Sequence, residues 1–164
     1  MTLTTHSIIA AAVTKPFLSY NPIAVFLLAL ASHYIADAIP HWDYSLRAVE
    51  NKENPDLRAW SNNRSLLIKD LMRFGLDGLL GAAIVITIMQ PISSAQWFGV
   101  AAMLIGGSLP DFLQGLYITR KFSFLGPLQH FHNRMHTKIK LGPYPLIGIP
   151  LQIAIVLVAL YALS

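Results

Sequence analysis

The fold is decided by residues Pro22–Asp43, whose sequence is PIAVFLLALASHYIADAIPHWD. The first part of this stretch is apolar, and its length predicts a helix that crosses a membrane. Its last eleven residues hold two histidines and two aspartates, which are His33, Asp37, His41 and Asp43. Ionisable side chains at membrane depth are costly, so they usually face a polar interior and take part in function.

The composition is that of a membrane protein. The chain has 164 residues, of which 54% are hydrophobic and only 12% are charged. This length predicts one domain, residues 1–164, and the apolar share is too high for an ordinary soluble domain. The chain contains no cysteine, which excludes thiolate metal sites, disulfides and thiol nucleophiles.

Four stretches are long and apolar enough to be expected to cross a bilayer, which takes about 20 residues each. A shorter helix over residues 5–14 precedes them, and a helix over residues 130–137 is expected to lie at the membrane interface. The sequence therefore predicts an all-α integral membrane bundle with four spans, a short N-terminal helix and an interfacial helix. The four predicted spans are Pro22–Pro40, Leu66–Gln90, Ala95–Ile118 and Tyr144–Leu163.

The basic residues fall on one side of this topology. Eleven of the twelve Lys and Arg residues lie in or beside the link between the first two spans or in the link before the fourth, and only Lys15 does not. Basic loops tend to stay in the cytoplasm, so this face is predicted to be cytoplasmic, in a bacterial-type inner membrane. Topology thus explains the net charge of +4, and no nucleic-acid partner is expected.

Most acidic residues and histidines gather at the same face. Five of the eight acidic residues lie within or at the ends of apolar segments, each at the basic end of its span. If three spans pack around one axis, eight ionisable side chains converge there. They are His33, Asp37, His41, Asp43, Asp77, Asp111, His132 and His136.

His33, Asp37 and His41 are spaced four residues apart, so a continuous helix would stack them on one face. Pro40 is expected to end or kink that helix, and Asp43 then approaches from the chain beyond it. Imidazole and carboxylate groups are ligands of divalent metals. The alternative is a polar helix end among lipid headgroups, which does not explain why His33 and Asp37 lie one and two turns deeper.

Two more carboxylates belong to the predicted site. Asp77 lies between two glycines in the second span and is expected to be a ligand, a general base or an acceptor for an imidazole N–H. Asp111 lies near the end of the third span, directly after Pro110, which is expected to open the helix. Asp111 is therefore predicted to be a metal ligand.

The segment 130–137 adds His132 and His136, a pair that can hold a divalent ion on one face of a helix. Arg134 is expected to bind an anionic substrate group such as phosphate. The alternative is a basic interfacial helix that touches anionic lipids. A strict four-span topology places His6 on the far face, whereas a hairpin between the first helix and the first span would return His6 to the site.

Three short motifs resemble those of a known family, and they are Thr5-His6, Leu109-Pro110-Asp111 and His132-x-x-x-His136-Thr137. They resemble the bacterial membrane-bound metal-dependent hydrolases described as LexA-regulated inner-membrane proteins. Those proteins show an early Thr-His, a Pro-Asp-x-Asp after an apolar helix and a His-Arg-Gly-x-Thr-His-Ser element. This chain has no second Asp after Asp111, and its two histidines are four rather than five residues apart.

A second resemblance is local. The element His33-x3-Asp37-x2-Pro40-His41 is similar to the His-x3-Asp-x3-Pro-x-His element of zinc-dependent phospholipase C and P1-type nucleases, which are soluble helical enzymes that hold zinc ions with it. The spacing differs slightly, and no other part of the chain matches. Both resemblances imply metal-assisted hydrolysis of a phosphoester.

The resulting prediction is a membrane-bound metal-dependent hydrolase, acting on a phosphoester or phospholipid-like substrate at the cytoplasmic interface, with membrane lipid as its partner. It would use one or two divalent ions, zinc first and Mn, Mg or Fe as alternatives. The predicted metal ligands are His33, Asp37, His41, Asp111, His132, His136 and His6, and the predicted catalytic residues are Asp43, Asp77 and Arg134. Three other interpretations stay open: a transporter or proton or cation carrier that uses buried Asp and His, a non-haem iron membrane oxidase, and a structural subunit with a metal site needed for folding.

Overall fold

The computed structural model describes residues 1–52 and 57–164. The described chain is almost entirely helical, which confirms the predicted all-α class. The helices are α1 (Leu3–Thr14), α2 (Pro22–Ala38), α3 (Arg64–Met89), α4 (Ser94–Arg120), α5 (Gly126–Met135) and α6 (Pro145–Leu163), with short 3-10 helices η1 (Lys15–Phe17) and η3 (Ser123–Leu125). Two short strands, β1 (Val49–Glu50) and β2 (Ala59–Trp60), pair antiparallel in the link between α2 and α3.

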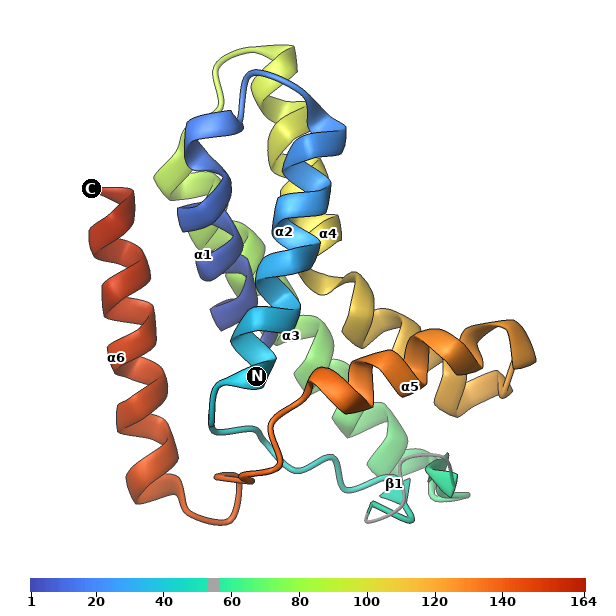
Figure 1. The fold of residues 1–164 in the computed structure, drawn as a ribbon. Coiled ribbons are helices and arrows are strands. Elements are labelled where there is room, and N and C mark those ends of the chain that lie inside the picture. Colours follow the sequence, from blue (N-terminus) through green and yellow to red (C-terminus); the bar gives the residue numbers. More distant parts are fainter. Residues whose placement is uncertain (53–56) are drawn as a thin grey trace.

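The first helix is the centre of the bundle. α1 packs against α2, α3, α4 and α6 (Figure 1). Several of its buried residues are small, among them Ala10, Ala11 and Thr14. Small side chains let neighbouring helices approach closely, so this short helix can have four neighbours.

α1 and α2 form an antiparallel hairpin that turns through η1 (Figure 1). Asn21 caps α2, because its side chain accepts a hydrogen bond from the Ile23 N–H. Pro22 follows at the first helical position, where its missing N–H costs nothing. The hairpin returns the start of the chain to the end of α2, so the strict four-span topology, which would place His6 on the far face, is wrong on this point.

Of the four predicted spans, two meet the length and apolarity of a membrane-crossing helix in the described residues. These are α3, with 26 residues, and α6, with 19. α2 is apolar but has only 17 residues, and α4 has 27 residues but is not apolar enough over a span's length. The expectation of four such helices is therefore corrected to two, because α2 is too short and α4 is too polar over a span's length.

Close approach of α2 and α4 depends on Gly106. A Cβ atom added there would lie 2.5 Å from the carbonyl oxygen of Phe26 and 3.1 Å from the Cβ of Ala29. Gly81 plays the same part between α3 and α1, since its added Cβ would lie 2.9 Å from the Cα of Thr4. Both distances are too short for a side chain, so glycine sets the spacing of these helix pairs.

The two prolines that were expected to interrupt helices behave differently. α2 ends at Ala38, two residues before Pro40, as predicted. Pro110, however, lies inside α4, which continues to Arg120. The expected opening of the helix at Pro110 is therefore wrong, and Asp111 projects from a continuous helix.

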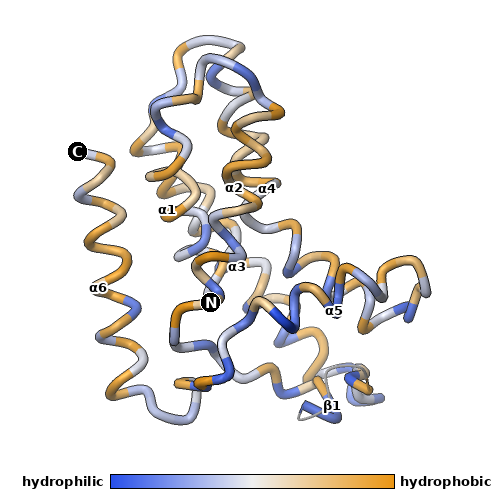
Figure 2. Tube along the Cα trace, in the orientation of Figure 1, coloured by the Kyte–Doolittle hydropathy of each residue, from blue (hydrophilic) through white to orange (hydrophobic). Residues whose placement is uncertain are grey.

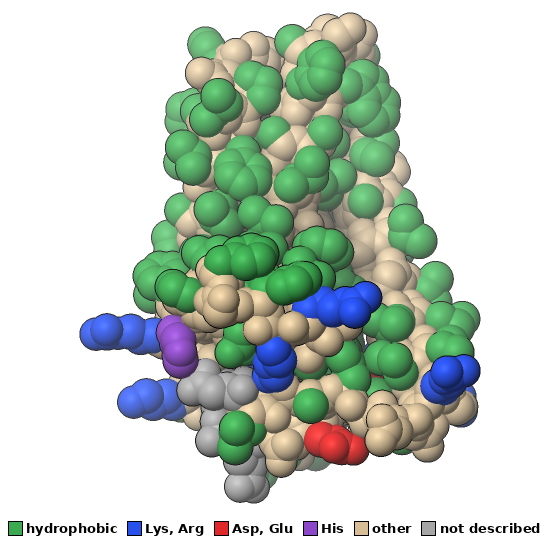
Figure 3. All heavy atoms as spheres, turned by 90° about the vertical axis from the view of Figure 1, so that its right-hand side faces the viewer, with side chains coloured by type: hydrophobic (Ala, Val, Ile, Leu, Met, Phe, Trp, Pro, Cys, Tyr) green, Lys and Arg blue, Asp and Glu red, His purple; other side chains and the backbone are tan. Residues whose placement is uncertain are grey.

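The molecule has an apolar end and a polar end. Hydrophobic residues dominate α6 and the upper parts of the α1–α2 hairpin and α4, whereas hydrophilic residues concentrate toward the lower loops and α5 (Figure 2). In the face drawn in Figure 3, the visible Lys, Arg, Asp, Glu and His side chains lie in the lower part and hydrophobic side chains cover the upper part. The basic side chains visible in this view thus lie at the polar end of the molecule.

Candidate metal centre

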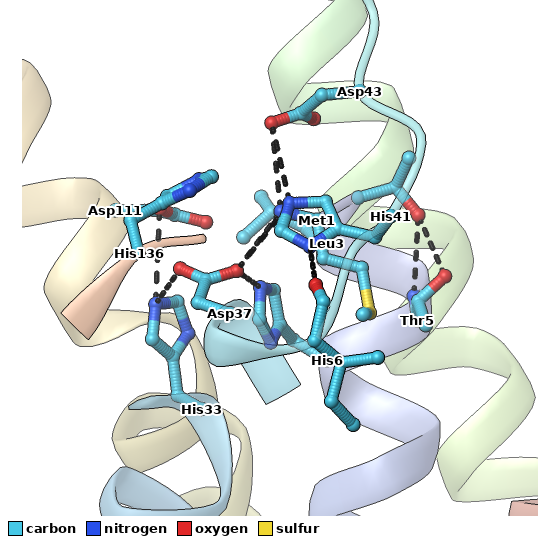
Figure 4. A network of polar contacts seen from close by, with 12 residues as sticks. Met1, Leu3, Thr5, His6, His33, Asp37, His41, Asp43, Asp111 and His136 are labelled. Atoms are coloured by element: carbon cyan, nitrogen blue, oxygen red, sulfur yellow. Dashed lines mark hydrogen bonds and ion pairs between the residues drawn. The ribbon is translucent and has the colours of Figure 1, made fainter. Parts of the chain in front are cut away.

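The predicted ligands meet where α1 begins and α2 ends, with α4 and α5 beside them (Figure 4). Asp37, in the last turn of α2, is fully buried at the centre of the cluster. Its carboxylate faces histidines from three parts of the chain. Two groups of side chains share this carboxylate and have ligand atoms close enough to hold a metal ion.

The first group is formed by four residues from three helices, which are His33, Asp37, Asp111 and His132. Asp37 Oδ2 lies 3.2 Å from His33 Nε2 and 3.1 Å from His132 Nε2. Asp111 Oδ1 lies 3.9 Å from His33 Nε2 and 3.8 Å from His132 Nε2. Ligands of a tetrahedral zinc ion with bonds of about 2.0–2.1 Å lie about 3.3 Å from one another, so this spacing suits a shared ion.

Backbone carbonyl groups orient two of the imidazoles. His33 Nδ1 lies 2.8 Å from the carbonyl oxygen of Gly107, and His41 Nδ1 lies 2.7 Å from that of Ile39. A carbonyl oxygen only accepts, so each Nδ1 carries the proton and donates it. In the neutral ring Nε2 is then left with a lone pair, which is how a second partner fixes the tautomer of a metal-binding histidine.

The second group is Asp37, His41 and His136. His41 Nε2 lies 3.8 Å from Asp37 Oδ1. The two histidines of the first group lie closest to the other oxygen of this carboxylate, Oδ2. The rings of His41 and His136 have centroids 4.9 Å apart. Three protein ligands leave a coordination position for water or substrate, as in catalytic zinc sites.

The chain after α5 is fixed to the chain after α2. The Thr137 N–H donates to the carbonyl oxygen of Asp37 at 2.8 Å, and His41 and Lys140 form a parallel bridge. His136 lies just beyond the end of α5, in extended backbone. The prediction that His132 and His136 would hold one ion from a single helix face is therefore not met, because the two residues belong to different groups.

His6 and the amino group of Met1 complete the surroundings of Asp37 (Figure 4). Asp37 Oδ1 lies 3.2 Å from His6 Nε2 and accepts a hydrogen bond from the Met1 amino group at 3.0 Å. The His6 ring stacks on that of His33 with centroids 3.9 Å apart. His6 thus reaches the site through the α1–α2 hairpin, although it lies in neither four-residue nor three-residue group.

The chemistry of these side chains fits a cation. Within the described chain, the Nε2 atoms of His6 and His33 are buried and make no hydrogen bond, although each is 3.2 Å from an Asp37 oxygen. Because His33 Nδ1 carries the proton, the lone pair on His33 Nε2 faces the Asp37 carboxylate and is repelled by it unless a positive charge lies between them. Buried polar atoms without a partner cost free energy, and a divalent ion would satisfy them.

Two histidines outside the helices have lowered pKa values. Burial lowers the pKa of His136 to about 4, the Lys140 ammonium group contributes to the shift, and Asp37 opposes it. Burial also lowers the pKa of His41, and the Met1 amino group adds to this effect. Both imidazoles are therefore neutral at pH 7, which is the form that binds metal ions.

Asp77 has a different position from the one expected. Its carboxylate accepts hydrogen bonds from the Leu3 N–H at 2.6 Å and the Thr4 N–H at 3.3 Å, and from the Thr4 hydroxyl at 2.6 Å. These amides are in the first turn of α1, where N–H groups lack partners within the helix and the helix dipole favours a negative charge. Asp77 therefore holds α1 on α3 and lies outside both metal-binding groups.

The other two predicted catalytic residues lie at the edge of the site. Asp43 is half exposed, with Oδ2 4.0 Å from His41 Nε2 and 3.5 Å from the Met1 amino group. Arg134 is exposed on α5, two residues after the buried His132. Asp43 can reach a molecule bound at the second group, whereas Arg134 borders the surface.

A cavity of about 360 Å³ adjoins the site. Met1, Asp43 and Asp111 contribute to its wall on the side of the metal-binding groups, and the rest of the wall comes mainly from α3, α4 and β2. A volume in this range is typical of small-molecule sites. The cluster is therefore connected to a space that a substrate can enter.

Sequence reasoning missed the contacts of backbone groups with the site, namely the carbonyls of Gly107 and Ile39 and the Met1 amino group. The Gly106-Gly107 pair was the one available signal, because adjacent glycines in a helix indicate a close backbone approach. No family model, curated protein or solved structure matches this chain. The family resemblance therefore depends on the short motifs alone.

Proposed function

We propose that this protein is a membrane-bound metal-dependent hydrolase that would hold two divalent ions with the two groups of side chains around Asp37 and cleaves a phosphoester of a lipid-like substrate at the cytoplasmic interface. The observation that carries the proposal is that the two oxygens of the Asp37 carboxylate face different pairs of histidines. Oδ2 faces His33 and His132, and Oδ1 faces His6 and His41. Asp37 would therefore be able to contribute to a metal site on either side of its carboxylate.

Zinc suits the donor set best. Imidazole nitrogen with carboxylate oxygen is typical of zinc, and also of iron and manganese, whereas magnesium prefers oxygen ligands and water. The four-residue group has the ligand number of a tetrahedral site, and the three-residue group retains an open position. The proposal therefore assigns catalysis to the ion at His41 and His136.

Each side chain has a stated task in the hydrolysis. His41, His136 and Asp37 would hold a divalent ion, which would supply a water molecule of lowered pKa and polarise the phosphoester. Asp43 would accept the proton of the attacking water, whose oxygen forms a new bond to phosphorus. The bond from phosphorus to the ester oxygen breaks, and the alcohol leaves with the proton that Asp43 took up. Arg134 is assigned to an anionic oxygen of the substrate.

The proposed location is the inner membrane, with the site at the cytoplasmic surface. Only 11% of the most apolar stretch of α3 and 22% of that of α6 are buried in the protein. Core helices of a soluble protein would be mostly buried, so these exposed apolar faces favour lipid as their surroundings. The concentration of Lys and Arg near the site end supports a cytoplasmic orientation, and α5 is proposed to lie at the interface.

A structural metal site is the second candidate. The group of His33, Asp37, Asp111 and His132 supplies four ligands, which is the closed coordination of structural zinc sites. It also joins α2, α4 and α5, so an ion there would stabilise the fold. The three-residue group and the adjoining cavity favour the enzyme.

Hydrolysis of a p-nitrophenyl phosphodiester whose second ester group is a long alkyl chain tests the proposal. Purified protein reloaded with zinc should release p-nitrophenol, and Asp37→Asn should lower the rate to that of buffer. Glu50→Gln is the control, because it makes the same change from acid to amide at an exposed residue of β1. Metal binding without turnover in the wild-type protein would contradict the hydrolase and leave the structural site.

A further inference from the structure

The cavity beside the metal centre is lined mainly by apolar side chains, with Asp70, Gln114 and Thr119 also in its wall. Asp43 and Asp111 lie at the end that joins the site. The apolar wall is formed by side chains of α3 and α4, and these are Leu71, Phe74, Phe112, Leu116 and Ile118. A small, fully polar substrate would use the metal centre but would leave this apolar wall exposed to water.

The position of the cavity favours a lipid over a soluble apolar molecule. Its lining residues come from the start of α3, the second half of α4 and β2, beside Asp43 and Asp111 of the site. Arg73 lies beside it, with its guanidinium carbon 5.7 Å from the ring centre of Tyr44, which lines the cavity. An amphiphile in the membrane could thus place its chain in the cavity and its anionic head between Arg73 and the metal centre.

We propose that this cavity binds the hydrocarbon chain of an amphiphilic phosphoester substrate whose head group lies at Asp43 and Asp111. This inference rests on the proposed function for the role of the head group, but the binding of the chain is independent of it. Chain burial supplies affinity in proportion to the apolar area removed from water. The cavity therefore selects lipid substrates over water-soluble phosphoesters.

Gly115 offers a direct way to fill the cavity. It lines the cavity from α4, and an added Cβ atom there would meet nothing within 4 Å. A larger side chain can thus occupy the space of the substrate chain without a clash with the backbone. Gly75 is the matched control, because it is also helical, has nothing within 4 Å of an added Cβ atom and does not line the cavity.

Trp60 provides a signal inside the cavity. It lines the wall, and its indole N–H donates to the Thr119 hydroxyl at 2.8 Å. Changing Trp42 and Trp97 to Phe leaves Trp60 as the single tryptophan. A long-chain alkylphosphonate that carries bromine in mid-chain, and whose P–C bond is not hydrolysed, is added at low mole fraction to protein in unbrominated lipid nanodiscs. It should quench Trp60, and the quenching should saturate as the mole fraction of the probe rises.

The series Gly115→Ala, Gly115→Val and Gly115→Leu should weaken this quenching stepwise. We expect Gly115→Leu to weaken it by about tenfold, the loss of about two buried methylene groups, and Gly75→Leu to leave it unchanged. The graded series separates filling of the cavity from misfolding of one variant. Equal quenching in the wild-type protein and Gly115→Leu would overturn the inference. So would quenching of a variant that retains only Trp97 to the same extent as the variant that retains only Trp60.

Adding and removing zinc distinguishes this inference from the proposed function. If both are right, zinc strengthens binding of the brominated alkylphosphonate, and inorganic phosphate competes with the head group. If the hydrolase proposal fails but the cavity binds chains, zinc has no effect, while the Gly115 series still weakens quenching. If the cavity does not bind chains, the Gly115 series has no effect whatever zinc does.

Discussion

Asp37 Oδ2 lies 3.1 Å from His132 Nε2, although the two residues are 95 positions apart in the sequence. The other oxygen of the same carboxylate lies 3.2 Å from His6 Nε2. One side chain of α2 thus joins α5 on one side and α1 on the other. The same contact therefore bears on both the stability of the bundle and the proposed chemistry.

Removing one histidine from either group should cost the protein one ion and leave the other ion bound. His132→Ala removes a ligand of the four-residue group, and His41→Ala removes a ligand of the three-residue group. We expect each variant to retain about half of the wild-type metal content, because the groups share only Asp37. Elemental mass spectrometry of the purified variants measures this. If either variant lost all of its metal, a single shared ion would be the better description.

Asp77→Asn should affect stability and leave the metal centre intact. The change removes the negative charge on α3 that accepts hydrogen bonds from the first turn of α1. The free energy of unfolding should therefore fall by about 1 kcal/mol. Thermal unfolding and zinc content are measured on the same preparation. Loss of zinc at unchanged stability would restore Asp77 as a ligand or catalytic base.

Gly106→Ala should push α2 and α4 apart. Its new Cβ atom would lie 2.5 Å from the backbone oxygen of Phe26, and overpacking of this kind costs about 1–3 kcal/mol. Zinc affinity should also fall, because His33 is oriented by the neighbouring Gly107 carbonyl. Gly75→Ala is the control and should be neutral or slightly stabilising. Equal unfolding temperatures for the two variants would contradict the packing argument.

The absence of cysteine makes the membrane orientation testable by labelling. Tyr20 lies in the turn between α1 and α2 and is 81% exposed, and Lys138 is exposed in the segment beside the site. In intact bacterial cells, Tyr20→Cys should react with an impermeant maleimide, and Lys138→Cys should react only after the membrane is opened. The reverse pattern would place the site outside the cytoplasm.

Sequence reasoning located the site but not its internal arrangement. The basic loops, the break at Pro40 and the clustered Asp and His residues were enough to predict that Asp37, Asp111 and His132 converge. The division into two groups was not predictable, because it depends on rotations of α2, α4 and α5 that spacing along one helix does not fix. His136, for example, leaves the helix one residue after Met135.

The number of apolar helices and the role of Asp77 were misjudged for related reasons. α4 was predicted as a span from its apolar stretch, but polar residues along the helix, Asp111 among them, keep its mean hydropathy too low over a span's length. Asp77 contacts Leu3 and Thr4 across 74 and 73 residues, and only the register between α1 and α3 determines that contact. The hairpin that brings His6 to the site was one of two arrangements that the sequence left open.

The ratio of zinc to protein tests the central claim most directly. Wild-type protein that is stripped with chelator, reloaded with zinc and freed of excess metal should hold about two ions per chain. Asp37→Asn should hold none, and Glu50→Gln should hold as many as the wild-type protein. Wild-type protein without bound zinc, or an unchanged ratio in Asp37→Asn, would contradict the account.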